Sequence, residues 1–351
     1  MTFIAKPRVE LPNEPVNAIG LRLRDYEGVG STLCAGCGHD SITAAIIQAF
    51  WELSLRPERV IKLSGIGCSS KTPAYFISGA HGFNSVHGRM PSVATGALAA
   101  NRDLVCIGVS GDGDSLSIGF GQFGHAVRRN LNMLYIIENN GVYGLTKGQF
   151  SASADPGSKA KRGEVNQMQC IDAAETAIAL GGAFAARSFS GDREQLVPLI
   201  KAGISHPGCA VLDVVSPCVT FNDHEGSTKS YAYTREHYAP AVQTDYIPRA
   251  EQITAEYEEG QTLPVTMHDG STLLLRKVDA EYDPTDRSAV LRYLEAHRSR
   301  GEVVTGLLFI NEDLPEMHEI AGTRQGALTA LPFETLNPGS AALAELQRRM
   351  R

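Results

Sequence analysis

The chain has 351 residues, of which 43% are hydrophobic and 20% are charged, and its formal net charge is −7 at pH 7. This composition is ordinary for a globular protein and excludes a globally disordered chain. The acidic balance argues against nucleic acid as a partner, and the absence of a long apolar stretch argues against a membrane-spanning helix. The first 20 residues contain charges and prolines instead of the apolar segment of a secretory signal, so we expect a cytoplasmic protein.

Apolar periodicity predicts alternating helices and strands up to about residue 215. In chain order we expect a helix from Asp40 or Ser41 to about Leu53, a strand over 60–63, a helix over 91–101, a strand over 104–109, a helix over 116–129, a strand over 132–137, helices over 172–182 and 192–205, and a strand over 209–215. Several of these strands are continuous apolar runs, which are typical of parallel strands buried on both faces. The pattern therefore predicts an α/β fold with a doubly wound, mostly parallel sheet.

The chain divides into three predicted regions, which are an irregular N-terminal arm over 1–30, the α/β domain over 31–240 and a C-terminal extension over 241–351. Within the extension we expect a hairpin over 264–278 with Asp269 and Gly270 at its turn, a helix over 286–297, a strand over 303–310 and a helix or tail over 336–351. No motif assigns a role to the residues after about 285. A lid, an interface and a partner-docking element are all compatible with them.

Two of the buried strands run into polar residues that are predicted to meet at one edge of the sheet. The first runs into a Gly-Asp-Gly triplet centred on Asp112, and the second runs into an asparagine pair that ends at Asn140, 28 residues later. A right-handed crossover sets these strands side by side. Asp112, Asn140 and the main-chain carbonyl of Val142 then offer three oxygens, which together with a diphosphate suit Mg²⁺. Gly111 and Gly113 allow phosphates to approach the backbone, whereas a lone triplet would be an ordinary turn.

Seven cysteines occupy positions 34, 37, 68, 106, 170, 209 and 218. Their odd number and the absence of an export signal indicate metal or redox chemistry before disulfides. Four thiolates, from Cys34, Cys37, Cys68 and Cys218, can hold either a [4Fe-4S] cluster or a structural Zn²⁺, and spacing alone does not separate the two. The CxxC pair alone also fits a redox dithiol. The other three cysteines are expected to be structural.

The ordered set of motifs resembles the β subunits of 2-oxoacid:ferredoxin oxidoreductases over roughly residues 30–240. Besides the triplet and the asparagine pair, five segments carry the resemblance: 34–39 (CAGCGH), 64–69 (SGIGCS), 87–89 (HGR), 126–130 (AVRRN) and 143–149 (YGLTKGQ). The resemblance implies a thiamin-diphosphate-binding fold with Mg²⁺ held at the triplet and a [4Fe-4S] cluster held by the four cysteines named above. The residues it implies beside the cofactor are His39, Gly67, Ser69, Gly111, Gly113, Asp114, Tyr143, Gly144, Leu145 and Thr146.

Three further residues are candidates for contact with substrate. His87 can donate to a developing oxyanion, and Arg89 or Lys147 can pair with a carboxylate of an anionic substrate. Each has an ordinary alternative, since loop histidines and arginines anchor loops and a loop lysine is usually a solvated charge.

The resemblance further implies oxidative decarboxylation of a 2-oxoacid to an acyl-CoA, with coenzyme A as acyl acceptor and electrons passed through the cluster to ferredoxin. The segment 216–222 (SPCVTFN) resembles the 2-oxoglutarate-type or broad-range members. No segment supplies the carboxylate that activates the aminopyrimidine ring of thiamin. In the family that carboxylate comes from the pyrimidine-binding domain of an α subunit, so we expect an αβ pair.

Two other functions compete with this interpretation. A non-oxidative thiamin-dependent decarboxylase or synthase would share Asp112 and Asn140 but has no need of the four cysteines. A binding module stabilised by Zn²⁺ would leave the Gly-Asp-Gly triplet unexplained.

Overall fold

The computed structural model describes residues 14–158, 163–216, 218–219, 254–266 and 272–350. The strands are β1 (Val60–Ser64), β2 (His81–Asn84), β3 (Val105–Gly111), β4 (Met133–Asn139), β5 (Val142–Tyr143), β6 (Gln149–Phe150), β7 (Phe184–Phe189), β8 (Cys209–Val215), β9 (Thr262–Thr266), β10 (Thr272–Lys277) and β11 (Glu302–Ile310). The helices are α1 (Gly38–Glu52), α2 (Met90–Ala100), α3 (Phe120–Arg128), α4 (Ala173–Ala179), α5 (Arg193–Ser205), α7 (Arg287–Arg298), α8 (Met317–Ala321), α9 (Phe333–Leu336) and α10 (Gly339–Arg349).

Nine of these strands form one sheet in the order β2-β1-β3-β4-β8-β7-β11-β10-β9. Pairing is parallel from β2 through β7, as the long apolar runs predict. Strand β11 then pairs antiparallel with β7, β10 is parallel to β11, and β9 closes the edge antiparallel to β10. The predicted doubly wound, mostly parallel α/β fold is confirmed, and strands of the predicted C-terminal extension continue the same sheet.

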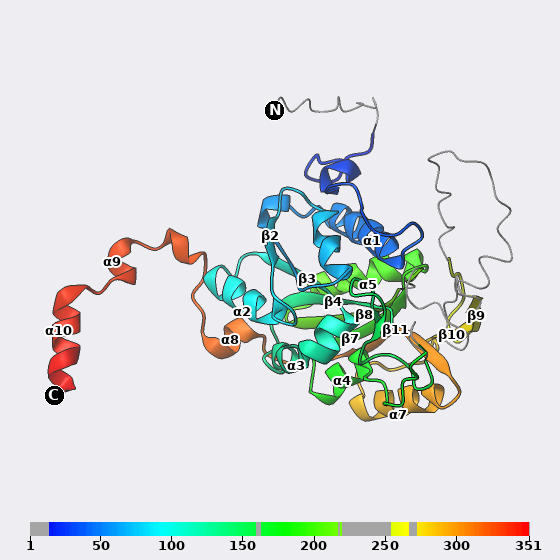
Figure 1. The fold of residues 1–351 in the computed structure, drawn as a ribbon. Coiled ribbons are helices and arrows are strands. Elements are labelled where there is room, and N and C mark those ends of the chain that lie inside the picture. The colour runs from blue at the N-terminus through cyan, green and yellow to red at the C-terminus, as the bar shows by residue number, and fades with distance from the viewer. Residues whose placement is uncertain (1–13, 159–162, 217, 220–253, 267–271, 351) are drawn as a thin grey trace.

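Helices cover both faces of the sheet, with α1 and α5 on one side and α2, α3, α4 and α7 on the other (Figure 1). Successive residues of β4 point to opposite faces, as the pleat requires. Leu134 and Ile136 pack into the core under α1 and α5, whereas Tyr135 and Ile137 pack into the core of the opposite layer. Burial on both faces explains why β4 carries no alternation of apolar and polar residues.

Aspartates cap three of the predicted helices. Asp172 accepts a hydrogen bond from the main chain of α4, Asp192 from that of α5, and Asp286 from that of α7. These caps satisfy amide groups that have no partner inside the helix, and they confirm the predicted helix starts closely. The helix predicted over 116–129 is instead divided into a π-helical turn, η4 (Gly113–Ile118), and α3. The break lies at Gly119, which packs against the backbone of Gly88.

The apolar periodicity indicates no strand between α4 and α5, and this is wrong. Strand β7 lies there, buried over its full length between β8 and β11. Its apolar run is interrupted by Arg187 and Ser188, which hid it from the periodicity. Strand β2 was also missed, because all of its residues are exposed at the sheet edge.

The two ends of the described chain differ from each other. Near the N-terminus the predicted irregular arm is anchored by Tyr26, which is fully buried and donates its hydroxyl proton to the carbonyl of Leu55 at 2.6 Å. Beyond α8 the chain leaves the body and ends in α9 and α10 (Figure 1). Apolar side chains there are at least half exposed, namely Phe333, Leu336, Leu343, Leu346 and Met350.

The predicted hairpin is present as β9 and β10, whereas its predicted turn at Asp269 and Gly270 lies outside the described residues. Within the part of the chain that the structure describes, every helix is too short or too polar to cross a bilayer.

A buried lysine ties β1 to the segment that follows the short helix η3 (Ser69–Ala74). The ammonium Nζ of Lys62 donates to the carbonyls of Phe76 at 2.6 Å and Ile77 at 2.9 Å. Burial lowers the pKa of Lys62 to about 8. The unfolded chain therefore binds this proton more tightly than the folded chain does.

We predict that the contribution of Lys62 to stability increases between about pH 8 and about pH 10.4. Below this window the amine is charged in both states, and within it the folded state loses its proton first, so rising pH favours folding. The difference in free energy of unfolding between the native chain and Lys62→Met, measured by denaturant titration, should grow by roughly 1–3 kcal/mol across the window. A difference that does not change with pH would contradict this.

Candidate functional site

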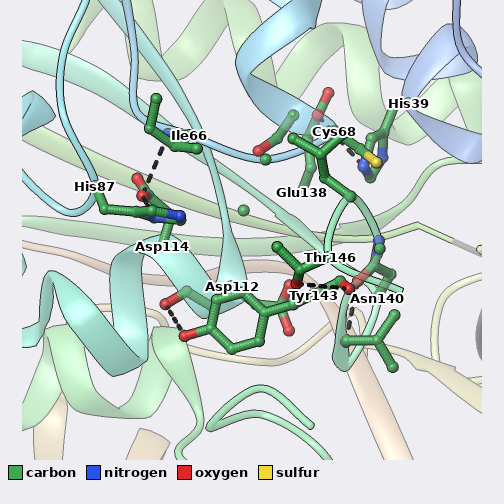
Figure 2. A pocket seen from close by; sticks show the side chains of 17 residues that line it. His39, Ile66, Cys68, His87, Asp112, Asp114, Glu138, Asn140, Tyr143 and Thr146 are labelled. Carbon is green, nitrogen blue, oxygen red and sulfur yellow. Dashed lines mark hydrogen bonds and ion pairs between the residues drawn. The ribbon is translucent and has the colours of Figure 1, made fainter. Parts of the chain in front are cut away.

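A pocket lies where the carboxyl ends of β1, β3 and β4 meet (Figure 2). Its lining residues come from five short segments of chain: His39, Ile66, Gly67, Cys68, Ser69, His87, Gly111, Asp112, Gly113, Asp114, Glu138, Asn140, Val142, Tyr143, Gly144, Leu145 and Thr146. The pocket thus brings together every predicted contact of the cofactor and of Mg²⁺, together with His87 and Cys68. Arg89, Lys147 and the other three cysteines of the predicted cluster do not line it.

Asp112 is buried in the pocket and is held by donors from the turn after β4 and from the chain after β6. Its Oδ2 accepts hydrogen bonds from the amide of Gly141 at 3.0 Å, from the hydroxyl of Ser153 at 2.5 Å and from that of Ser151. Burial raises the pKa of Asp112, and the two serine hydroxyls oppose that rise. Asn140 lines the same wall. Asp112 and Asn140 thus offer oxygen ligands of the kind that a hard cation prefers.

Asp114 acts differently from Asp112, although only one residue separates them. Its Oδ1 accepts from the ring Nδ1 of His87 at 2.7 Å and from the amides of Gly88 at 2.9 Å and Ile66 at 3.3 Å. Its Oδ2 accepts from the hydroxyl of Ser110 at 2.8 Å. The buried carboxylate therefore joins the loops that follow β1 and β2, and it holds His87 at the pocket wall, as Figure 2 shows.

Glycines are required where the backbone approaches these groups. A Cβ at Gly65 would lie 1.7 Å from Oδ2 of Asp114. A Cβ at Gly113 would lie 2.6 Å from the ring of Tyr143, whose hydroxyl donates to the Gly113 carbonyl at 2.9 Å. Tyr143 thereby covers the turn after β3 and closes one side of the pocket.

The candidate substrate residues Arg89 and Lys147 are exposed. The guanidinium of Arg89 donates to the carbonyl of Gly88 at 3.4 Å. Lys147 lies in the tight turn between β5 and β6, with a φ of 78°. Their predicted roles toward substrate remain predictions.

Glu138 lines the pocket and is fully buried at the end of β4, although no sequence motif singles it out. Both of its carboxyl oxygens accept from the hydroxyl of Thr72, at 3.1 and 3.0 Å, and Oε2 lies 3.7 Å from Nε2 of His39. On its other side, His39 Nδ1 lies 2.6 Å from the hydroxyl of Ser216. Burial raises the pKa of Glu138 well above its usual value. An acidic residue inside an otherwise apolar strand was the available signal.

Of the four cysteines predicted to hold a cluster, Cys68 lines the pocket. The amide of Cys37 donates to the carbonyl of Cys34 at 3.0 Å. Burial raises the pKa of the Cys68 thiol, and the negative charges of Cys218 and Cys34 raise it further. Burial and the charge of Cys218 likewise raise the pKa of Cys37. Cys68 is thus influenced by Cys34 and Cys218, and Cys37 by Cys218.

Among the described residues, the cysteine side chains are not arranged as a metal-binding site. No three His, Cys, Asp or Glu side chains in this described part of the chain lie close enough together to hold a metal ion. The four-cysteine ligand set therefore remains a prediction. The predicted Mg²⁺ site has only one carboxylate, that of Asp112, and its other ligands are the oxygens of Asn140 and of the Val142 main chain. The finding on three His, Cys, Asp or Glu side chains therefore does not bear on it.

A protein-family model described as the C-terminal TPP binding domain of thiamine pyrophosphate enzymes matches residues 65–214. This range begins just after β1 and ends within β8, and it contains Asp112, Asn140 and most of the pocket.

Two curated relatives are similar over a longer range. The β subunit of 2-oxoacid:ferredoxin oxidoreductase 1 from Aeropyrum pernix is 45% identical over 211 residues, which are 60% of this chain and 63% of that protein. The 2-oxoacid:ferredoxin oxidoreductase subunit beta from Saccharolobus solfataricus is 41% identical over 228 residues, which are 64% of this chain and 72% of that protein. The chain thus spans slightly less than two thirds of the first relative.

A solved structure has a similar fold. The 2-oxoglutarate:ferredoxin oxidoreductase from Magnetococcus marinus, with 2-oxoglutarate, coenzyme A and succinyl-CoA bound, superposes with a TM-score of 0.69 at 28% identity. The match covers 86% of this chain and 89% of that one.

Substitution of Gly65 tests the close packing at Asp114. We predict that Gly65→Ala lowers the free energy of unfolding by roughly 1–3 kcal/mol, because the new methyl group displaces the carboxylate from its four donors. The matched control is Gly96→Ala on α2, where a Cβ meets nothing within 4 Å. That change should be neutral or slightly stabilising, since alanine favours helix. Equal stability of the two variants in denaturant titrations would show that the contact is unimportant.

Proposed function

Because this chain belongs to the β-subunit family of 2-oxoacid:ferredoxin oxidoreductases, we propose that it binds the thiamin diphosphate of such an enzyme. The enzyme would oxidise a 2-oxoacid to an acyl-CoA and pass the electrons to ferredoxin. The observation that carries the proposal is the convergence of Asp112, Asn140 and Val142 on one pocket at the ends of β3 and β4.

The residues of the pocket fit a cation and a diphosphate. Asp112, Asn140 and the carbonyl of Val142 would hold Mg²⁺, which prefers oxygen ligands. Gly111 leaves room for phosphate beside the backbone. A side chain at this position would fill that room, because its Cβ would lie only 3.0 Å from the hydroxyl of Ser69. Thiamin diphosphate, once bound, supplies the electron sink for decarboxylation. The chain itself orients the cofactor and surrounds it with buried polar groups.

The four cysteines would hold a [4Fe-4S] cluster on the side of the pocket that contains Cys68. Burial and neighbouring thiolates raise the pKa of Cys37 and Cys68, so that ionised thiols in this place need a compensating positive charge. Iron supplies such a charge and binds thiolate sulfur. The position of Cys68 in the pocket lining would give electrons a short path from the cofactor. Reduced thiols of this kind are expected in the cytoplasm, where we place the enzyme.

An α subunit would complete the active site. Of the carboxylates that line the described pocket, Asp112 is proposed for Mg²⁺, Asp114 is held by His87 and Ser110, and Glu138 accepts from Thr72. In the resembling family the carboxylate that activates the aminopyrimidine ring comes from the α subunit. Leu145, which lines the pocket, is 51% exposed, and Val86, which precedes the pocket residue His87 in the chain, is 72% exposed. Exposed apolar side chains beside a functional site are typical of a surface that a partner covers. We therefore propose that the chain is active only as part of an αβ pair.

We propose 2-oxoglutarate as the 2-oxoacid. Support comes from the Magnetococcus enzyme, which is named for this substrate and has it bound, and from the segment that begins at Ser216. The second carboxylate of the substrate would need a cation, for which Arg89 and Lys147 are the candidates. His87, held by Asp114, would face the reacting carbonyl.

We predict that Asp112→Ala weakens Mg²⁺-dependent binding of thiamin diphosphate by more than about 100-fold and leaves the iron content unchanged, because it removes the charged ligand of the cation. Calorimetric titration of the cofactor in the presence of Mg²⁺ measures the effect. The matched control is Asp103→Ala, which removes an exposed carboxylate just before the opposite end of β3. Cofactor affinity equal to that of the control would refute the cation assignment.

We predict that Cys218→Ser lowers the iron content, removes the broad absorbance near about 400 nm and blocks electron transfer to ferredoxin, because a hydroxyl is a poor iron ligand. The control is Cys170→Ser, which changes a cysteine outside the proposed ligand set. Anaerobic purification, iron analysis and a visible spectrum check the result. Full iron content and activity in Cys218→Ser would exclude this cysteine, and stoichiometric zinc without the absorbance would exclude the cluster.

A further inference from the structure

A continuous line of polar contacts joins Asp112 to a buried arginine on β7. The hydroxyl of Ser153 lies 2.5 Å from Oδ2 of Asp112 and 2.9 Å from Oδ1 of Asn139. The amide nitrogen of Asn139 donates to Oδ1 of Asp213 at 3.0 Å. Oδ2 of Asp213 accepts from Nε of Arg187 at 2.8 Å. Four contacts thus connect the proposed cation ligand to a strand that takes no part in the pocket.

The far end of this line is rigid. Arg187 and Asp213 are 6% and 2% exposed, and they are partners in the register of β7 with β8. The guanidinium also binds both oxygens of Asp172, at 2.5 and 2.6 Å. Since Asp172 caps α4, a helix and two strands fix the position of one guanidinium. Planar, multidentate contacts of this kind hold a carboxylate in one orientation.

The orientation of Asn139 follows from that of Asp213. A carboxylate only accepts hydrogen bonds, so Asn139 must turn its amide nitrogen toward Asp213 and its oxygen toward Ser153. Ser153 has a single hydroxyl proton and lies between two acceptors, Asp112 and Asn139. Its position is therefore set from both sides. Ser151, which lies 2.9 Å from the Ser153 hydroxyl and also contacts Asp112, completes the group.

We propose that Asp213 and Asn139, clamped by Arg187, are positioning residues that orient Asp112 for the divalent cation. All three donors to Asp112 named above reach Oδ2, which directs Oδ1 toward the cation. This inference rests on the proposed Mg²⁺ site. Groups that orient a metal ligand without touching the metal commonly change metal affinity by about 10- to 100-fold. The line thus predicts that a residue on β8 sets the affinity for Mg²⁺ from outside the pocket.

The sharpest test compares two isosteric changes at the same arginine. Asp213→Asn weakens the contact with Arg187. It also allows the Asn139 amide to adopt either of its two orientations, because the new amide can donate as well as accept. Asp172→Asn weakens the contact with the same Arg187 but does not touch Asn139. Both variants lose one charge beside a buried arginine, so a merely structural role should affect them alike.

The readout is the Mg²⁺ concentration that gives half-maximal binding of thiamin diphosphate, measured by calorimetry on the full chain purified with its partner and stripped of cofactor. We expect a rise of about 10-fold for Asp213→Asn and of less than about 2-fold for Asp172→Asn. Thermal unfolding without Mg²⁺ shows whether each variant is folded. If the two variants need the same Mg²⁺ concentration, the positioning role is refuted, whereas a native protein that binds no thiamin diphosphate refutes the proposed function instead.

A second measurement keeps the inference testable if Asp213→Asn does not fold. Ser153→Ala removes the hydroxyl that links Asp112 to Asn139, and Asn139→Leu removes the amide. If Ser153 and Asn139 both act on Asp112 through the same contacts, their effects are not additive. The double variant should then need no more Mg²⁺ than the single variant with the lower Mg²⁺ affinity. Fold-changes that simply multiply would show that the two residues act independently and would overturn the proposal.

Discussion

The parallel pairing of β3 with β4 places the carboxylate of Asp112 beside the loop that follows β4. Gly111 and Glu138 are partners in that register, so the chain after each of them leaves the sheet at the same level. The amide of Gly141 then reaches Asp112 at 3.0 Å, and Asn140 comes to the same wall. The strand pairing thus fixes where Asp112 and Asn140 leave the sheet, and the turn after β4 completes their approach.

Asp112 and Asp114, which are separated by one residue, have different roles in the pocket. Asp114 holds the loops after β1 and β2, and with them His87, so it shapes the pocket. Asp112 is held by two serines at Oδ2, and we propose that its other oxygen binds the cation. On the opposite wall, Glu138 and His39 form a buried polar pair next to Cys68. The pocket therefore has one side with oxygen ligands, which we propose for Mg²⁺, and another side with Cys68, beside which we propose the cluster.

The sequence predicted what depends on local pattern and missed what depends on distant contacts. Strand-end motifs located Asp112 and Asn140, and apolar runs located β3, β4 and β8. Strand β7 was missed because Arg187, which lies in its interior, is acceptable there only through Asp172 and Asp213, far away in sequence. The break at Gly119 likewise depends on contact with Gly88. The cysteine spacing left zinc and iron open, and only the resemblance favoured a cluster.

Anomalous diffraction from crystals grown with Mn²⁺ in place of Mg²⁺ and with thiamin diphosphate tests the central claim most directly. Mn²⁺ scatters anomalously and also prefers oxygen ligands. The account predicts one strong peak at about 2.1 Å from oxygens of Asp112, Asn140 and Val142, beside the diphosphate. A manganese peak elsewhere in the pocket, or a diphosphate bound without contact to Asp112, would contradict it.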